Sequence, residues 1–137
     1  MKSEKEMSLR GVRVLVIEDA VENMRLFRAI LRLEDATMLE AYRGAEGIEI
    51  AKSEVPDVIL VDMQMPEMDG LTATRLLRAD PKTTAIPVIV VTASAMAEDR
   101  ARAFDAGCSG YITKPVDPVT LGKQIAAFLP PRVANSD

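Results

Sequence analysis

The chain has 137 residues, 48% of them hydrophobic and 28% charged, a composition typical of one globular domain. Its net charge of −4 argues against nucleic acid or an anionic membrane surface as the main partner, since both need a basic surface. The single cysteine, Cys108, excludes an internal disulfide, and the absence of histidine excludes every triad or zinc site that needs an imidazole.

Short apolar runs alternate along the chain with segments whose apolar residues recur at helical spacing. The runs rich in valine and isoleucine predict strands at 12–17, 36–41, 57–61, 87–91 and 110–113. Helices are predicted at about 21–33, about 44–53, from Asp69-Gly70 to about 79, at about 97–106, and from Asp117-Pro118 onward. Gly107 is expected to follow the fourth helix as its C′ residue.

Strict alternation of strands and helices predicts an α/β fold, with a parallel sheet covered by helices on both faces. We expect one domain over residues 11–129, with a flexible leader at 1–10 and a flexible tail at 130–137. No apolar run approaches the ~20 residues of a membrane span. The first ten residues also lack the apolar region of a signal peptide, so we expect a cytoplasmic protein.

Polar residues follow four of the predicted strands, at the point where each strand ends. They are Glu18 with Asp19, then Asp62, Thr92 and Lys114. Ligands of open parallel sheets bind outside the carboxyl ends of the strands, so these side chains are expected to share one pocket. Alone, each residue would more simply be a helix cap, a turn residue or a solvated surface group. The occurrence of all five residues at four strand ends favours the pocket.

The three carboxylates of this set predict a cation. Two carboxylates about 4 Å apart repel by roughly 4 kcal/mol at an effective dielectric constant near 20. A hard divalent ion with oxygen ligands, Mg²⁺ above all, relieves that repulsion and leaves positions for water and phosphate oxygens. The ammonium group of Lys114 is suited to a phosphoryl oxygen.

Four segments together resemble the receiver domain of bacterial two-component response regulators, in order and in spacing. They are VLVIEDAVEN at 14–23, PDVILVDMQMPEMDG at 56–70, IPVIVVTA at 86–93 and AGCSGYITKP at 106–115. The resemblance covers about residues 11–129 and implies a flavodoxin-like (βα)5 fold with strand order 2-1-3-4-5. It also implies a stand-alone receiver, acting as a diffusible regulator or a phosphorelay shuttle.

The resemblance assigns roles to the strand-end residues. Asp62 would accept a phosphoryl group from a phosphohistidine on a partner, forming an aspartyl phosphate. Mg²⁺ would be bound directly by Asp19 and Asp62, by the backbone carbonyl of Gln64, and through water by Glu18. Lys114 would contact the phosphoryl group.

The same resemblance implies a conformational switch. Thr92 would move to hydrogen-bond the phosphoryl group, and Tyr111 would swing inward as Thr92 shifts. The Lys114-Pro115 bond would be cis, at the modest cost of an X-Pro bond. Two side chains would tune the rate at which water hydrolyses the phosphate, Gln64 and Ser94.

The implied partners are a sensor histidine kinase or a histidine phosphotransfer protein, together with an unknown downstream target. The chain would be a signalling protein rather than an enzyme, with intrinsic autophosphorylation and autodephosphorylation. A homodimer would use the fourth helix, fifth strand and fifth helix. Two alternatives stay open, an adaptor that works without phosphorylation and a Mg²⁺-dependent phosphatase with an aspartyl nucleophile. Gln64 stands where that phosphatase would carry a second aspartate.

Overall fold

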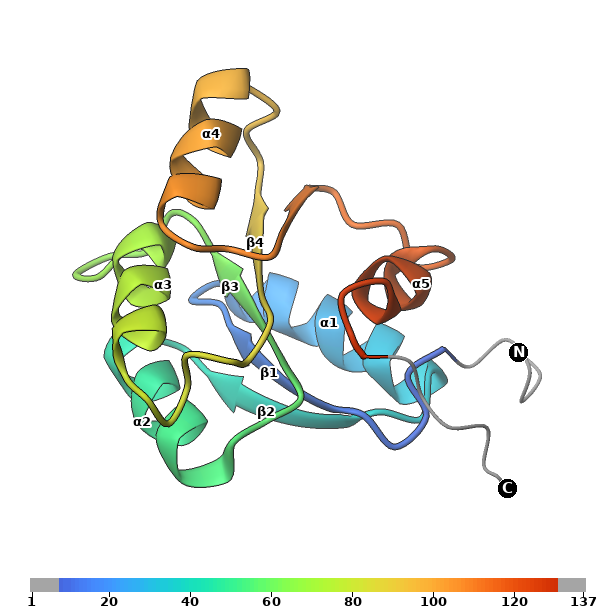
Figure 1. Cartoon of the computed structure of the whole chain (residues 1–137). Helices are drawn as coiled ribbons and strands as arrows, with labels where there is room; N and C mark the ends of the chain where they lie inside the picture. The colour runs from blue at the N-terminus through green and yellow to red at the C-terminus, as the bar shows by residue number, and fades with distance from the viewer. Residues whose placement is uncertain (1–7, 131–137) are drawn as a thin grey trace.

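The computed structural model describes residues 8–130 of the chain. Within them the strands are β1 (Arg13–Ile17), β2 (Thr37–Ala41), β3 (Val58–Asp62), β4 (Val88–Thr92) and β5 (Gly110–Thr113). The helices are α1 (Val21–Leu33), α2 (Gly44–Glu54), α3 (Gly70–Ala79), α4 (Ala97–Asp105) and α5 (Leu121–Ala126). Every strand pair is parallel and the order is β2-β1-β3-β4-β5, which confirms the predicted α/β fold (Figure 1).

Helices cover both faces of the sheet because the side chains of each strand alternate between two cores. Leu15 and Ile17 of β1 belong to the core that also contains buried residues of α2, α3 and α4. Val14 and Val16 belong to the other core, with buried residues of α1 and α5. All residues of β3 and β4 are buried, so the ends of these strands are held rigidly by packing on both sides.

The helix α4 is the least embedded of the helices and stands at the top of the molecule in Figure 1. Of its nine residues only Ala103 is buried. The side chain of Phe104 is 41% exposed, and Met96, just before the helix, is 57% exposed. Little apolar surface therefore fixes the position of α4 against the sheet.

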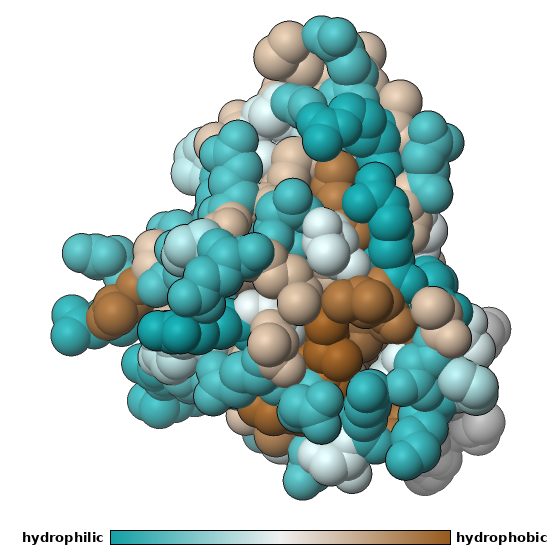
Figure 2. All heavy atoms as spheres, turned by 90° about the vertical axis from the view of Figure 1, so that its left-hand side faces the viewer, coloured by the Kyte–Doolittle hydropathy of each residue, from teal (hydrophilic) through white to brown (hydrophobic). Residues whose placement is uncertain are grey.

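Figure 2 shows the side of the molecule that lies on the left in Figure 1, where polar residues surround an apolar patch in the lower middle. On this side α2 and α3 pack together, and a groove of about 390 Å³ between them is lined partly by Ile48, Leu76 and Ala79. Lys52 lies in the same groove and pairs with Asp80 at 3.4 Å.

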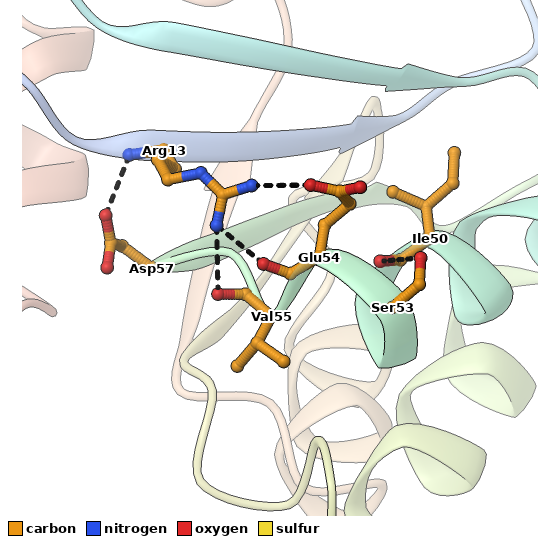
Figure 3. Close-up of polar contacts among 6 residues, drawn as sticks. All are labelled: Arg13, Ile50, Ser53, Glu54, Val55 and Asp57. Atoms are coloured by element: carbon orange, nitrogen blue, oxygen red, sulfur yellow. Dashed lines mark hydrogen bonds and ion pairs between the residues drawn. The ribbon is translucent and has the colours of Figure 1, made fainter.

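Arg13 connects β1 with the end of α2 and with the segment before β3, at the edge of the sheet opposite the strands' carboxyl ends (Figure 3). Its backbone N–H donates to Asp57 Oδ2 at 2.8 Å, just before β3. Its guanidinium donates to the backbone carbonyl of Glu54 at 2.5 Å and to the Glu54 carboxylate at 2.8 Å. An arginine at a helix C-terminus satisfies carbonyls that have no partner within the helix, so this contact fixes the end of α2 beside β1 and β3.

The last helix begins later than predicted. The sequence places its start at Asp117-Pro118, whereas α5 begins at Leu121. Asp117 Oδ1 accepts from the backbone N–H of Val119 at 2.9 Å, and its backbone carbonyl accepts from that of Leu121 at 2.9 Å. The aspartate therefore closes a turn over 118–120 instead of capping the helix. Gly107 is confirmed as the C′ residue of α4, with a φ of 106°.

The predicted flexible leader at 1–10 contains Leu9, whose side chain packs in the core. Leu9 is fully buried and belongs to the core beneath α1 and α5, and the backbone N–H of Ser8 donates to Glu34 Oε1 at 2.8 Å. An apolar side chain gains free energy by joining that core, which holds this part of the leader in place. Residues 1–7 and 131–137 lie outside the described residues, so the rest of the predicted leader and tail stays a prediction.

No helix of the described residues is long and apolar enough to cross a membrane.

Candidate functional site

Three of the predicted side chains meet at the carboxyl ends of the strands, those of Glu18, Asp62 and Lys114. Lys114 Nζ lies 2.9 Å from Glu18 Oε1 and 3.4 Å from Asp62 Oδ1. Glu18 is 1% exposed and Asp62 is 8% exposed. Buried charges are tolerated when an opposite charge and hydrogen bonds accompany them. The ammonium group of Lys114 supplies that charge to both carboxylates.

Backbone hydrogen bonds between neighbouring strands position these side chains. The backbone N–H of Glu18 donates to Ala41 at the end of β2 at 3.0 Å, and that of Lys114 donates to Thr92 at the end of β4 at 2.7 Å. Both residues thus continue the pairing of their strands by one position beyond Ile17 and Thr113. The following Lys114-Pro115 peptide bond is cis.

Asp19 is exposed beside this buried pair of carboxylates. One carboxylate oxygen from each of Glu18, Asp19 and Asp62 lies within 4.8 Å of the others. Three carboxylates and one ammonium group leave an excess of negative charge, which a hard divalent cation with oxygen ligands fits. The residues present therefore match the predicted magnesium chemistry.

Asp62 has a perturbed pKa. Burial and the nearby Glu18 carboxylate raise the pKa of Asp62 from 3.8 to about 6, against the opposing effect of Lys114. A carboxylate with this pKa is mostly ionised at neutral pH, yet it is more basic than a solvated aspartate. Its ionisation and its basicity both suit a nucleophile that must be deprotonated at physiological pH.

Thr92, Ser94 and Tyr111 are linked to one another rather than directly to the carboxylates. Thr92 is buried, and its Oγ1 accepts from the backbone N–H of Ser94 at 3.2 Å. The hydroxyl of Tyr111 donates to the backbone carbonyl of Ser94 at 2.9 Å. The exposed Gln64 touches the site through its backbone N–H, which lies 3.4 Å from Asp62 Oδ1.

Sequence reasoning missed Asp99, which joins this network from α4. The hydroxyl of Ser94 donates to Asp99 Oδ2 at 2.6 Å. The available signal was an acidic residue in the first turn of a helix, five positions after Ser94. That signal also describes Glu98 next to it, so the pattern alone does not select Asp99.

A doubly wound parallel sheet with an acidic pocket at the carboxyl ends of β1 and β3 defines a flavodoxin-like α/β domain that is built to hold a cation. Residues 14–126 match the family described as the response regulator receiver domain, and the chain belongs to that family. As a member of this family, the chain is a phosphoacceptor in two-component signalling.

The chain is similar to known response regulators over most of its length. Protein PilH of Pseudomonas aeruginosa is 40% identical over 117 residues, which cover 85% of this chain and 97% of PilH. The polar-differentiation response regulator DivK of Brucella anthropi is 37% identical over 116 residues, covering 85% of this chain and 94% of DivK.

A solved structure agrees with the fold. The receiver domain of the sensor histidine kinase PA1611 from Pseudomonas aeruginosa superposes with a TM-score of 0.80 at 30% identity, covering 86% of this chain and 97% of that one. That structure has a magnesium ion coordinated in its active-site cleft.

Proposed function

We propose that Asp62 is the residue that accepts the phosphoryl group. The observation that carries this assignment is the position of its carboxylate, which is buried at the end of β3 and held 3.4 Å from Lys114 Nζ. Packing on both faces of the sheet fixes the carboxylate, as a positioned nucleophile requires.

The donor is a phosphohistidine of a sensor histidine kinase or a histidine phosphotransfer protein. A carboxylate oxygen of Asp62 attacks the phosphorus, the P–N bond breaks, and the imidazole leaves with its electron pair. The product is an aspartyl phosphate. Phosphoryl transfer asks a protein mainly for positioning and for charge that faces the phosphoryl oxygens. Lys114 supplies that charge from its place between Glu18 and Asp62.

The cofactor in this proposal is Mg²⁺. Asp19, Asp62 and the backbone carbonyl of Gln64 would hold it directly, with Glu18 acting through water. When bound, the ion would neutralise charge on the phosphoryl oxygens. The clustered oxygens of the three carboxylates support this assignment, as does the magnesium-bound cleft of the PA1611 receiver domain.

Phosphorylation would be read through Thr92 and Tyr111. Thr92 gives up its bond to the Ser94 N–H and donates to the phosphoryl group, and Tyr111 follows because its hydroxyl is bonded to the same Ser94. This movement favours an active arrangement of α4, β5 and α5, which is the surface for a downstream target or a second copy. Two positions next to the site would tune hydrolysis of the phosphate, Gln64 and Ser94.

The test is phosphorylation by a small-molecule donor. The protein is incubated with Mg²⁺ and acetyl phosphate and weighed intact by mass spectrometry, with and without EDTA. Asp62→Asn is the test variant, and Asp105→Asn, an exposed aspartate of α4, is the matched control. We expect one phosphoryl group on the wild-type protein and on the control, and none on Asp62→Asn or with EDTA.

Other outcomes separate the alternative functions. No phosphoryl group and no phosphate release, under conditions that modify a known receiver, would identify an adaptor that works without phosphorylation. Steady release of phosphate from a range of phosphate esters would identify an aspartyl phosphatase. The amide of Gln64 already disfavours the phosphatase, because an amide cannot act as the general acid that such an enzyme places there.

A further inference from the structure

Ser94 connects three parts of the molecule with every polar group it has. Its N–H donates to Thr92 Oγ1 at 3.2 Å, and its carbonyl accepts from the hydroxyl of Tyr111 at 2.9 Å. Its own hydroxyl donates to Asp99 Oδ2 at 2.6 Å and accepts from the backbone N–H of Met96 at 3.2 Å. A movement of Ser94 would therefore change hydrogen bonds at β4, at β5 and at the start of α4.

Asp99 is the residue of α4 that accepts a hydrogen bond from Ser94. A hydrogen bond from a hydroxyl to a carboxylate at this distance is of the strong, charge-assisted kind. The other oxygen of the same carboxylate, Oδ1, lies 3.3 Å from Arg102 Nη1 one turn along the helix. Asp99 is thus held from two sides, by the loop after β4 and by its own helix.

Few other contacts set the position of α4. Ala103 is its only buried residue. The guanidinium carbon of Arg100 lies 5.2 Å from the ring centre of Phe104 and 5.7 Å from that of Tyr111, which adds a cation–π contact between α4 and β5. An element held by so few contacts has a low free energy of rearrangement. The Ser94–Asp99 bond is one of the few polar contacts that attach it to the rest of the molecule.

Space for such a rearrangement lies beside the helix. A cleft of about 400 Å³ opens between the loop after β3 and α4. Its lining includes Met63, Gln64, Met65 and Asp69 on the side of the loop, and Asp99 and Arg102 on the side of the helix. The helix therefore faces open space on the side of the loop after β3.

We propose that Asp99 is a positioning residue that transmits the state of Thr92 through Ser94 to α4 and Tyr111. This inference rests on the proposed phosphorylation of Asp62. When Thr92 turns to the phosphoryl group, the N–H of Ser94 loses its acceptor and the loop shifts. Asp99 makes α4 move with the loop. Without Asp99, the loop after β4 and the helix α4 respond to phosphorylation separately.

Tyr111 itself provides the readout. The chain has two tyrosines, Tyr42 and Tyr111, and no tryptophan. In a Tyr42→Phe background, intrinsic fluorescence reports on Tyr111 alone. Fluorescence is recorded before and after treatment with acetyl phosphate and Mg²⁺. Intact mass gives the phosphorylated fraction of the same sample, so that the signal is expressed per phosphorylated molecule.

Three variants are compared in that background, Asp99→Ala, Asp99→Asn and Glu98→Ala. We expect Asp99→Ala to lower the Tyr111 response by about fivefold or more, the lower end of typical coupling between two sites. Asp99→Asn should retain most of the response, because the amide oxygen still accepts from the Ser94 hydroxyl. Glu98→Ala changes the neighbouring exposed carboxylate in the same helical turn and should respond as the parent does.

A fourth variant tests whether a folding defect explains the loss of the response. Ser94→Ala removes the donor of the same bond and should lose the response as Asp99→Ala does, with far-UV circular dichroism reporting on the helices of both. A full Tyr111 response in phosphorylated Asp99→Ala, or an equal loss in Glu98→Ala, would overturn the inference and leave the proposed function standing. Absence of any phosphoryl group on the parent protein would overturn both.

Discussion

Lys114 and Glu18 are 96 positions apart in the sequence, and the ammonium group of one donates to the buried carboxylate of the other at 2.9 Å. This pair joins β5 to β1 across two intervening strands of the sheet. It also places the cation of Lys114 where Asp62 can share it, at 3.4 Å. The charge balance of the site therefore depends on one side chain.

Replacing Lys114 by glutamine should destabilise the fold. The buried Glu18 and Asp62 would then face each other without a cation, and removal of one partner of a buried ion pair typically costs about 3–5 kcal/mol. We expect the free energy of unfolding in urea, measured with EDTA at pH 8, to fall by about 3 kcal/mol. The loss should be smaller at pH 5, where the raised pKa of Asp62 lets that carboxyl take a proton.

Lys123→Gln is the control for this experiment, because it removes an exposed lysine from α5. An equal effect of the two substitutions would mean that the pair with Glu18 contributes nothing beyond the net charge.

Asp62→Asn should stabilise the protein at neutral and alkaline pH. The pKa of Asp62 is raised from 3.8 to about 6, so the folded state prefers the protonated carboxyl. The stability that comes with this proton is fully present below about pH 4 and is lost as the pH rises through about 6. With EDTA at pH 8, we expect the variant to exceed the wild type by about 1–3 kcal/mol in unfolding free energy.

The pH dependence is the decisive part of that measurement. The difference between the Asp62→Asn variant and the wild type should shrink toward zero near pH 4, whereas Asp105→Asn at the surface should show no comparable trend. A constant difference from pH 4 to pH 8 would contradict the raised pKa.

Arg78→Met should cost more stability than any other arginine substitution on α3. The guanidinium of Arg78 donates to the backbone carbonyls of Gly107 at 2.7 Å and Ile86 at 2.6 Å, and to Ser109 Oγ at 3.1 Å. Methionine fills the volume but leaves these acceptors without their donor, at about 1–3 kcal/mol for each buried group. We expect a loss of about 3 kcal/mol in urea unfolding, against less than about 0.5 kcal/mol for the exposed Arg75→Met.

Gly70→Ala should displace the end of β3. A Cβ atom at Gly70 would collide with the backbone carbonyl of Asp62, which cannot move aside as a side chain can. We expect a loss of about 2 kcal/mol in unfolding free energy and slower phosphorylation by acetyl phosphate. Gly44→Ala is the matched control at the start of α2, because the three atoms nearest to its Cβ belong to the side chain of Met68. Equal costs would count against a backbone clash.

The strands and their parallel arrangement were predictable because their signals are local, whereas the strand order was implied by the family resemblance. Buried parallel strands appear as short runs of valine and isoleucine, and a polar residue directly after such a run, as at Asp62, must lie at the carboxyl edge. The convergence of the carboxylates and Lys114 follows from that edge together with the strand order that the family resemblance implies. The pairing of Lys114 with Glu18 does not, because it depends on how the Lys114 side chain reaches across the ends of the two strands between β5 and β1.

Other contacts have no sequence signature at all. The guanidinium of Arg78 is bonded to backbone carbonyls, and every residue has a carbonyl, so the pattern of α3 shows only an arginine on a helix. Asp99 is chosen over Glu98 by its orientation toward Ser94 within one helical turn. Leu9 looks like part of a polar leader until the fold shows that the core extends to it.

The connection between Lys114 and Glu18 also has a consequence for how the protein is made. A ribosome delivers Glu18, Asp19 and Asp62 long before it delivers Lys114, and a domain generally folds as a unit. The growing chain therefore carries its three carboxylates without the ammonium group that pairs with two of them, Glu18 and Asp62. Closure of the acidic pocket must wait for the final strand, so an interrupted translation product ending before β5 would expose a negatively charged, half-built sheet to the cell's chaperones.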